Sequence, residues 1–190
     1  MRDFVIGYGS LINISSLRRT LKDKDYIEPV IVKNHMRAWE ASDLLTHKPI
    51  TYLNARKCEE ESFNGVIFEV SKDELKLLDD REVLYERYII NGEDLELLIK
   101  NSKLHPTKMD KIWIYSAKKP YFASKEFPIS LAYLNICLKG CMQIEKDFGL
   151  RGFTKDFIKT TKKWSEFWNF DDKLTSEFEE LLYYIKKEEI

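Results

Sequence analysis

The stretch FVIGYGSLIN, Phe4 to Asn13, decides the fold of the N-terminal part of this chain. Its first residues, Phe4 to Tyr8, are apolar or aromatic apart from Gly7, which predicts a buried β-strand that ends at Gly9. A glycine allows the backbone to approach a ligand closely, and successive N–H groups after it can converge on an anion. From these residues alone, a plain glycine turn at the end of a strand remains the simpler interpretation.

Three familiar motifs do not match this turn. A dinucleotide fingerprint requires a third glycine where the chain has Ile12, and a P-loop requires Gly-Lys-Ser/Thr, which is absent. A nucleophile elbow requires a glycine two residues after Ser10, and that position is again Ile12. The turn is therefore a candidate ligand cradle of another kind, or no site at all.

The composition narrows the class of protein. The chain has 190 residues, 44% of them hydrophobic, which suggests one domain with a sizeable core. Lysine plus arginine number 31 and aspartate plus glutamate 32, a balance that argues against nucleic-acid binding. We expect no membrane contact, because no apolar run approaches the roughly 18 residues of a span, and no signal peptide. The sparse cysteines Cys58, Cys137 and Cys141 fit a reducing, cytoplasmic location.

The pattern of elements predicts strands first and helices last. A short helix capped by Ser15 or Ser16 should follow the first strand, and Ser71 with Glu74 forms a capping-box signature for a helix that follows. The other predicted elements are a hairpin of strands 28–34 and 36–42, a second pair 50–57 and 63–70 around the polar loop CEEES, strands 85–90 and 111–117, and helices 129–148, 153–164 and 173–187. This order predicts an α+β domain with a small mixed, barrel-like sheet.

The cysteines and histidines do not form a metal-binding pattern. Cys137 and Cys141 lie on the apolar face of the predicted helix 129–148, so we interpret them as core residues. The histidines His35, His47 and His105 are scattered without ligand spacing. We therefore expect neither a metal nor a cofactor.

A second stretch, LDDREVLYERY from Leu78 to Tyr88, places a carboxylate at a junction between elements. Glu82 follows a predicted helix and precedes a strand that begins near Tyr85, so its side chain could lean over a cleft. Judged by residue types alone, a solvated run of charges is the stronger interpretation.

The two stretches together carry more information than either alone. A strand ending in Tyr-Gly-Ser-Leu, followed in order by GVIFEV, SKDELKLLDDRE and YERY, resembles the γ-glutamylcyclotransferase-like family, which includes γ-glutamylamine cyclotransferases, plant AIG-type proteins and the ChaC branch. The resemblance covers roughly residues 4 to 147 and implies a family domain over residues 1–150 with a small mixed barrel and flanking helices. It also implies that Glu82 is the catalytic carboxylate. The γ-glutamyl pocket would be lined by Tyr8, Gly9, Ser10 and Leu11, with Tyr85 or Tyr88 as a further substrate-binding tyrosine.

The chemistry of this family fits a chain without an obvious nucleophile or metal site. The α-amine of a γ-glutamyl compound attacks its own γ-carbonyl, forming 5-oxoproline and releasing the attached amine, amino acid or peptide. Such a reaction needs a base, for which Glu82 is the candidate, and backbone donors such as the Gly9–Leu11 amides. Many relatives carry glycine after the catalytic glutamate, where this chain has Val83. The alternative is a non-catalytic module on the same fold that binds a γ-glutamyl-type ligand or another protein.

Residues 151–190 lie beyond the resemblance and form a predicted helical extension. The segment WSEFWNF, residues 164–170, is densely aromatic, and apolar residues recur at helical spacing through Phe178, Leu181, Leu182 and Ile185. An apolar face of this kind must be buried. We expect the extension to pack on its own domain, with a homodimer contact as the alternative.

Overall fold

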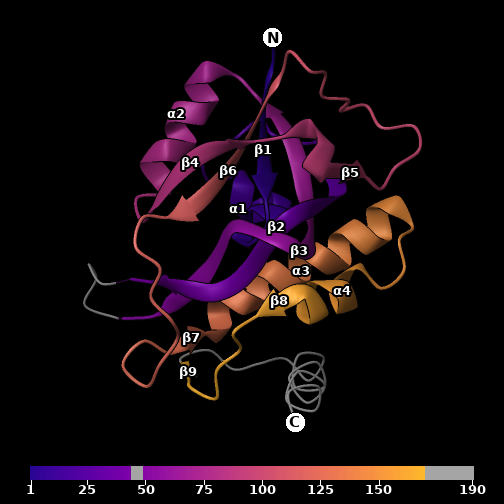
Figure 1. The fold of residues 1–190 in the computed structure, drawn as a ribbon. Helices are drawn as coiled ribbons and strands as arrows, with labels where there is room; N and C mark the ends of the chain where they lie inside the picture. Colours follow the sequence, from indigo (N-terminus) through magenta and orange to yellow (C-terminus); the bar gives the residue numbers. More distant parts are fainter. Residues whose placement is uncertain (44–48, 170–190) are drawn as a thin grey trace.

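The computed structural model describes residues 1–43 and 49–169, which form one mixed β-sheet with helices around it (Figure 1). The described strands are β1 Asp3–Gly7, β2 Glu28–Ser42, β3 Thr51–Val70, β4 Tyr85–Ile90, β5 Leu95–Leu97, β6 Lys111–Ala117, β7 Ile129–Ser130, β8 Thr161–Lys162 and β9 Trp168–Asn169. The helices are α1 Ile14–Leu17, α2 Lys72–Arg81, α3 Leu131–Phe148 and α4 Phe153–Thr160, with 3-10 turns η1 Ser10–Ile12 and η2 Gly92–Asp94. The predicted helix 173–187 and its apolar positions lie outside the described residues.

The sheet has the strand order β4-β6-β1-β3-β2-β5, and the short strands β7, β8 and β9 join it from the side. Strand β1 lies in the centre, antiparallel to β3 and parallel to β6. This arrangement confirms the predicted α+β class with a mixed sheet. Between the described strands β4 and β5 no pairing closes the sheet, so it is an open sheet and not a closed barrel.

The predicted hairpin within residues 28–42 and the predicted division of residues 50–70 into two strands are wrong. Each region is a single long strand, and β2 pairs with β3 along most of its length. The register jumps from Lys33↔Ser62 to His35↔Lys57, so the polar segment Cys58–Glu61 bulges out of β3 instead of forming a turn between two strands. The two halves of each strand therefore continue in the same direction across this bulge, and a second, smaller register shift falls between Trp39 and Ala41.

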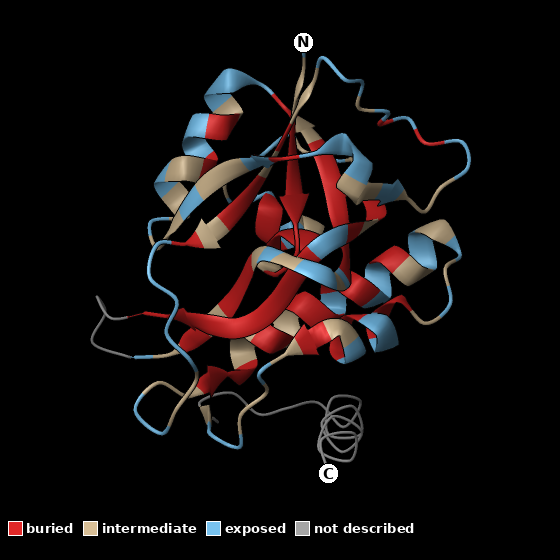
Figure 2. Ribbon diagram, viewed as in Figure 1, coloured by how far each residue is buried: buried red, intermediate tan, exposed pale blue. Residues whose placement is uncertain are grey.

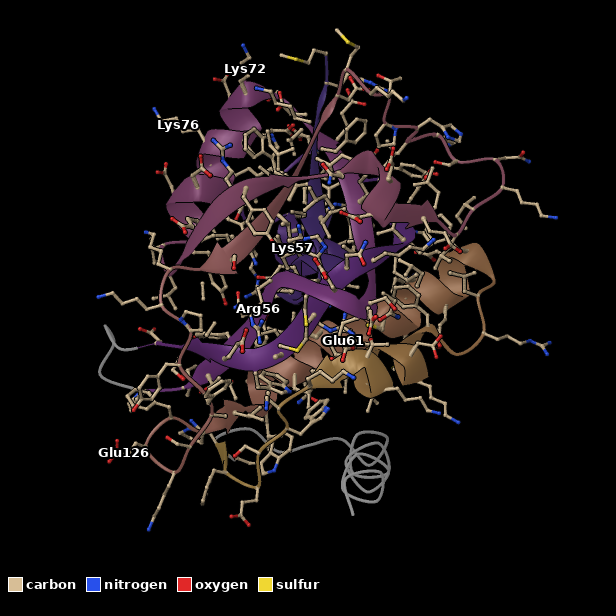
Figure 3. All side chains as sticks on the ribbon, viewed as in Figure 1. Arg56, Lys57, Glu61, Lys72, Lys76 and Glu126 are labelled. Atoms are coloured by element: carbon tan, nitrogen blue, oxygen red, sulfur yellow. The ribbon has the colours of Figure 1, made fainter. Side chains whose placement is uncertain are left out.

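Helix α2 begins and ends as its sequence indicates. Ser71 and Glu74 form the predicted capping box, each side chain accepting from the other residue's backbone N–H. Leu75 and Leu78 are buried, whereas Lys72 and Lys76 point outward from the helix (Figure 3). The short helix α1, in contrast, is capped by Asn13, whose side chain accepts from the N–H of Ser16, and not by Ser15 or Ser16. One apolar face thus holds α2 on the sheet, with its C-terminal end close to β4.

Helix α3 packs directly on the turn that follows β1. Its predicted apolar stripe is buried, including both cysteines, which confirms that Cys137 and Cys141 are core residues. At Gly140, a Cβ atom would lie only 2.7 Å from the backbone nitrogen of Asn13, so glycine permits the close approach of α3 to η1 and α1. Figure 2 shows the buried band running from the central strands to the inward side of α3.

Helix α4 ends earlier than predicted, because Thr161 leaves the helix to pair with β2. The buried guanidinium of Arg37 links these segments, donating to the side chain of Thr161, to the carbonyl of Phe157 and to Asn64 on β3. Farther along, the ring of Trp164 lies 5.4 Å from that of Trp39. These contacts hold residues 153–164 against the sheet; a homodimer contact of the C-terminal extension stays a prediction.

Candidate active site

A cleft opens where β1 ends, beside the C-terminal end of α2 and the first turns of α3. Its outer part has a volume of about 330 Å³, and a small inner recess of about 20 Å³ adjoins it. Four residues line both parts: Ser10, Glu82, Tyr85 and Tyr133. The inner recess is otherwise lined by Tyr8, Gly9, Leu11, Leu53 and Tyr115, and the outer part by Ser16, Arg19, Asp43, Tyr52, Arg81, Val83, Leu84 and Ile136.

Six of the seven residues singled out from the sequence therefore meet in this cleft, namely Tyr8, Gly9, Ser10, Leu11, Glu82 and Tyr85. Tyr88 does not line either part. It stacks on His35 instead, with 6.0 Å between the ring centroids. Of the two tyrosines left open by the sequence, Tyr85 is the one that faces the cleft.

Glu82 is placed by the end of α2. Its backbone N–H donates to the carbonyl of Leu78, and its own carbonyl accepts from the N–H of Tyr85, both at 2.9 Å. This tight connection leads the chain into β4 and leaves the Glu82 side chain 17% exposed. The side chain is thus held at the border between the two parts of the cleft.

The electrostatic environment of Glu82 suits an acid–base group. Burial raises the pKa of Glu82 above its ordinary value, while the neighbouring guanidinium of Arg81 opposes this shift. The Nε atom of Arg81 lies 3.2 Å from Oε1 of Glu82. A carboxylate with a raised pKa takes up a proton more readily than an exposed one, which is what a general base near neutral pH requires.

The walls around Glu82 are tyrosines whose hydroxyls are held in place. The hydroxyl of Tyr8 donates to the carbonyl of Tyr115 at 2.7 Å, and that of Tyr85 donates to the carbonyl of Leu53 at 2.8 Å. Burial, and secondarily nearby charges that include Glu82, raises the pKa of Tyr8 and Tyr85 far above the ordinary value. These rings are therefore neutral and form a rigid, weakly polar wall.

A tertiary contact, which the sequence did not reveal, explains why the turn after β1 needs a glycine. The hydroxyl of Tyr133, on α3, lies 3.4 Å from the backbone nitrogen of Ser10 and accepts its N–H. A Cβ atom on Gly9 would collide with that same hydroxyl. Gly9 is therefore needed for the close approach of Tyr133 to the turn, and Tyr133 joins the candidate anion cradle.

Arg81 connects the turn to the carboxylate, although the sequence offered it only as part of a charged run. Its Nη1 donates to the carbonyl of Ser16 at 3.0 Å, and its Nη2 donates to the hydroxyls of Ser10 and Ser16, both at 3.1 Å. Since Nε pairs with Glu82, one guanidinium spans α1, the turn after β1 and the end of α2. No local spacing could have identified this contact, because Ser10 and Arg81 are 71 positions apart.

Asp79, one turn before Glu82, has a different environment. Arg87 Nε and the Tyr115 hydroxyl both donate to its Oδ1, at 2.7 and 2.8 Å. Although burial by itself would raise the pKa of Asp79, hydrogen bonds from Arg87 and Tyr115 lower it below the usual value. The Asp79 carboxylate therefore stays ionised and hydrogen-bonded to Arg87 and Tyr115, whereas the Glu82 side chain faces the cleft.

Within residues 1–43 and 49–169, no three His, Cys, Asp or Glu side chains gather as a metal-ligand set. None of the helices that the structure describes is long and apolar enough to cross a membrane.

Comparison with known proteins gives matches only among solved structures. No family model matches the chain, and no curated protein is significantly similar to it in sequence. A structure described as a γ-glutamyl cyclotransferase superposes with a TM-score of 0.64 at 15% identity, covering 98% of this chain and 99% of the other. An uncharacterized human protein gives 0.61 at 14% identity, covering 95% of this chain and 97% of its own.

A yeast γ-glutamyl cyclotransferase specific to glutathione is also similar, with a TM-score of 0.54 at 12% identity over 87% of this chain and 99% of its own. At such identities the likeness concerns the fold. The TM-scores above 0.5 and the high coverage of both chains in each comparison lead to one conclusion: this chain has the γ-glutamylcyclotransferase fold.

Proposed function

We propose that this protein is a γ-glutamylcyclotransferase, which closes the γ-glutamyl group of a small substrate into 5-oxoproline and releases the attached amine. The observation that carries the proposal is the position of Glu82, a largely buried carboxylate of raised pKa, beside the Ser10 turn in one cleft. The fold shared with γ-glutamyl cyclotransferase structures supports it.

The reaction begins with folding of the substrate into a ring-closing conformation. The outer cleft, at about 330 Å³, has room for a γ-glutamyl dipeptide. Holding the α-amine against the γ-carbonyl removes much of the entropic barrier, about 7–11 kcal/mol in well-oriented intramolecular reactions. The rigid wall formed by Tyr85 and the other tyrosines serves this positioning.

Glu82 then accepts a proton from the α-ammonium of the substrate. The freed amine attacks the γ-carbonyl carbon, so that the ring C–N bond forms and the carbonyl oxygen becomes an oxyanion. The Tyr133 hydroxyl, whose oxygen accepts the Ser10 N–H, is the candidate donor to this oxyanion.

Collapse of the intermediate breaks the original amide bond. Glu82 returns its proton to the leaving nitrogen, which also gains the second proton lost by the ring nitrogen. The leaving group departs as an ammonium, no water is consumed, and Glu82 ends in its starting state. Arg81, paired with Glu82, favours the return of the carboxylate to its charged form.

The test is direct. The purified protein is incubated with glutathione, γ-glutamyl dipeptides and γ-glutamyl-ε-lysine, and 5-oxoproline is measured by mass spectrometry, with the Glu82→Gln variant as control. We expect product from at least one substrate with the native protein and a greatly reduced yield with the variant. Absence of product from all of them would favour the non-catalytic binding module, for which the exposed Val83 in place of a usual glycine and the C-terminal extension are the motivating features.

A further inference from the structure

We infer that Trp164, which lines neither part of the cleft, is a positioning residue of the active site: it acts through Trp39 to hold the ring of Tyr133 in place. The inference rests on the proposed function, in which the Tyr133 hydroxyl is the candidate donor to the oxyanion. It gives a catalytic consequence to the segment 164–169, for which the sequence predicted only packing on the domain or a homodimer contact.

The Tyr133 hydroxyl occupies a position with little tolerance. It accepts the N–H of Ser10 with 3.4 Å between nitrogen and oxygen, which is long for a hydrogen bond. On the other side, Gly9 only just leaves room for the hydroxyl, because a Cβ atom there would collide with it. A small movement of the Tyr133 ring in either direction would therefore break the contact or close the turn upon it.

The Tyr133 ring contacts two aromatic neighbours edge-on. Its centroid lies 4.9 Å from that of Tyr52, in the cleft wall, and 6.1 Å from that of Trp39. Trp39 is completely buried, and its Nε1–H has no hydrogen-bond acceptor among residues 1–43 and 49–169. No described hydrogen bond fixes the Trp39 ring, so its position, and its support of Tyr133, depend on packing.

Trp164 supplies part of this packing. Its ring centroid lies 5.4 Å from that of Trp39, and the ring of Trp168, in β9, lies 6.1 Å farther along from that of Trp164. Ring contacts therefore run without a break from the cleft to β9. Removal of the Trp164 ring would leave a void beside Trp39, into which Trp39 could move and release Tyr133.

A second connection, through the backbone, joins the same segment to Tyr133. Strand β9 pairs in parallel with β7, with Asn169 opposite Ser130 (Figure 1). The Ser130 hydroxyl accepts the N–H of Tyr133 and so caps the first turn of α3. The segment 164–169 thus supports both the ring and the backbone of Tyr133.

The experiment is a double-mutant cycle between Trp164 and the Tyr133 hydroxyl. The kcat and KM for 5-oxoproline release, with the γ-glutamyl substrate that the native protein turns over fastest, are measured for the native protein, Trp164→Ala, Tyr133→Phe and the double variant. We expect Tyr133→Phe to lower kcat about a hundredfold, as loss of an oxyanion donor does. Trp164→Ala should lower kcat about tenfold with little change in KM, because a displaced donor weakens an interaction made only in the transition state. In the Tyr133→Phe background the same substitution should have almost no further effect, since the hydroxyl that it displaces is already gone.

The segment itself provides the controls. Trp164→Phe keeps a ring against Trp39 and should restore most of the lost kcat. Phe167→Ala removes an exposed aromatic side chain from the same segment, while its carbonyl still accepts the N–H of Ile129 in β7, so it should match the native protein. If thermal unfolding shows that Trp164→Ala is not folded at the assay temperature, Trp164→Leu, which leaves a smaller void, takes its place in the cycle.

Each other result has a distinct meaning. Equal losses of kcat from Trp164→Ala with and without the Tyr133 hydroxyl would overturn the inference, because the two residues would then act independently. Native kcat in Trp164→Ala, or an equal loss in Phe167→Ala, would also overturn it. A fully active Tyr133→Phe would overturn the inference but leave the proposed function standing. No 5-oxoproline from the native protein with glutathione, γ-glutamyl dipeptides or γ-glutamyl-ε-lysine would overturn the proposed function itself and this inference with it.

Discussion

Glu28 and Glu82 are both largely removed from solvent, yet their carboxylates are used in opposite ways. Glu28, at the start of β2, is completely buried and accepts hydrogen bonds from the Tyr26 hydroxyl and the Lys103 N–H, both at 2.6 Å, and from the Ser102 hydroxyl. Glu82 has one described side-chain partner, Arg81, and faces a cleft. The first carboxylate has filled its acceptor sites with protein donors, whereas the second keeps most of them open.

The difference separates a structural role from a functional one. Hydrogen bonds to Glu28 offset the cost of burying its charge and fix the segment 102–104 to β2. Glu82 bears much of its burial cost without such compensation, as its raised pKa indicates. A buried, perturbed carboxylate in a cleft is a typical feature of an active site. Three predictions test this contrast and one tests the wall of the cleft beside Glu82, in order from the largest expected effect to the smallest.

Glu82→Gln should abolish most catalysis and leave binding intact. The amide keeps the shape of the side chain but cannot accept a proton, so we expect kcat/KM for 5-oxoproline formation to fall about a hundredfold or more. A γ-glutamyl ligand should still bind in calorimetry. Activity within a few fold of the native protein would show that another group is the base.

Glu28→Ala should instead destabilise the fold, because three donors would lose their buried acceptor. We expect a loss of about 3 kcal/mol in the free energy of unfolding, measured by urea denaturation. The folded fraction should keep native kcat/KM. Unchanged stability, or a specific loss of catalysis, would contradict the structural role assigned to Glu28.

Gly9→Ala should cost about 2 kcal/mol, since the added methyl group must displace the buried hydroxyl of Tyr133. The double variant Gly9→Ala/Tyr133→Phe removes that hydroxyl and should recover part of the lost stability. Thermal unfolding of the native protein, both single variants and the double variant measures the coupling. Simple additivity would show that the collision is not the source of the loss.

The smallest effect concerns the stability of Glu82→Gln itself. Because burial raises the pKa of Glu82 in the folded protein, its protonation favours the folded state below the unfolded pKa, and this contribution is lost as pH rises through the folded pKa. At pH 7 the charged carboxylate therefore costs stability that a neutral glutamine does not.

We accordingly expect the variant to be at least as stable as the native protein at pH 7. The difference should shrink as the pH is lowered through the range above the ordinary carboxyl pKa of 4.5. Melting temperatures at pH 7 and pH 4 measure it. A variant that is less stable at neutral pH, with the gap closing in acid, would mean that the Arg81 ion pair outweighs burial.

Elements that depend on neighbouring residues were predicted well. The capping box of α2, the strand Lys111–Ala117 and the buried stripe of α3 all follow from patterns within a few residues. The strands β2 and β3 were divided wrongly, because a polar segment in the middle resembles a turn. Whether such a segment reverses the chain or bulges depends on the partner strand, which local patterns do not specify.

For the cleft, the sequence by itself determined the strand that ends in a glycine turn and the carboxylate that follows α2. Only the tertiary structure brought these two features together and placed Tyr85, and not Tyr88, in the cleft. It also placed Tyr133, Arg81 and Arg19 in the cleft wall. The physical reason is the range of the interactions. Helix caps and apolar stripes act between neighbours in sequence, whereas the contacts of Ser10 with Arg81 and Tyr133 span 71 and 123 positions and form only when β1, α2 and α3 pack on a common core.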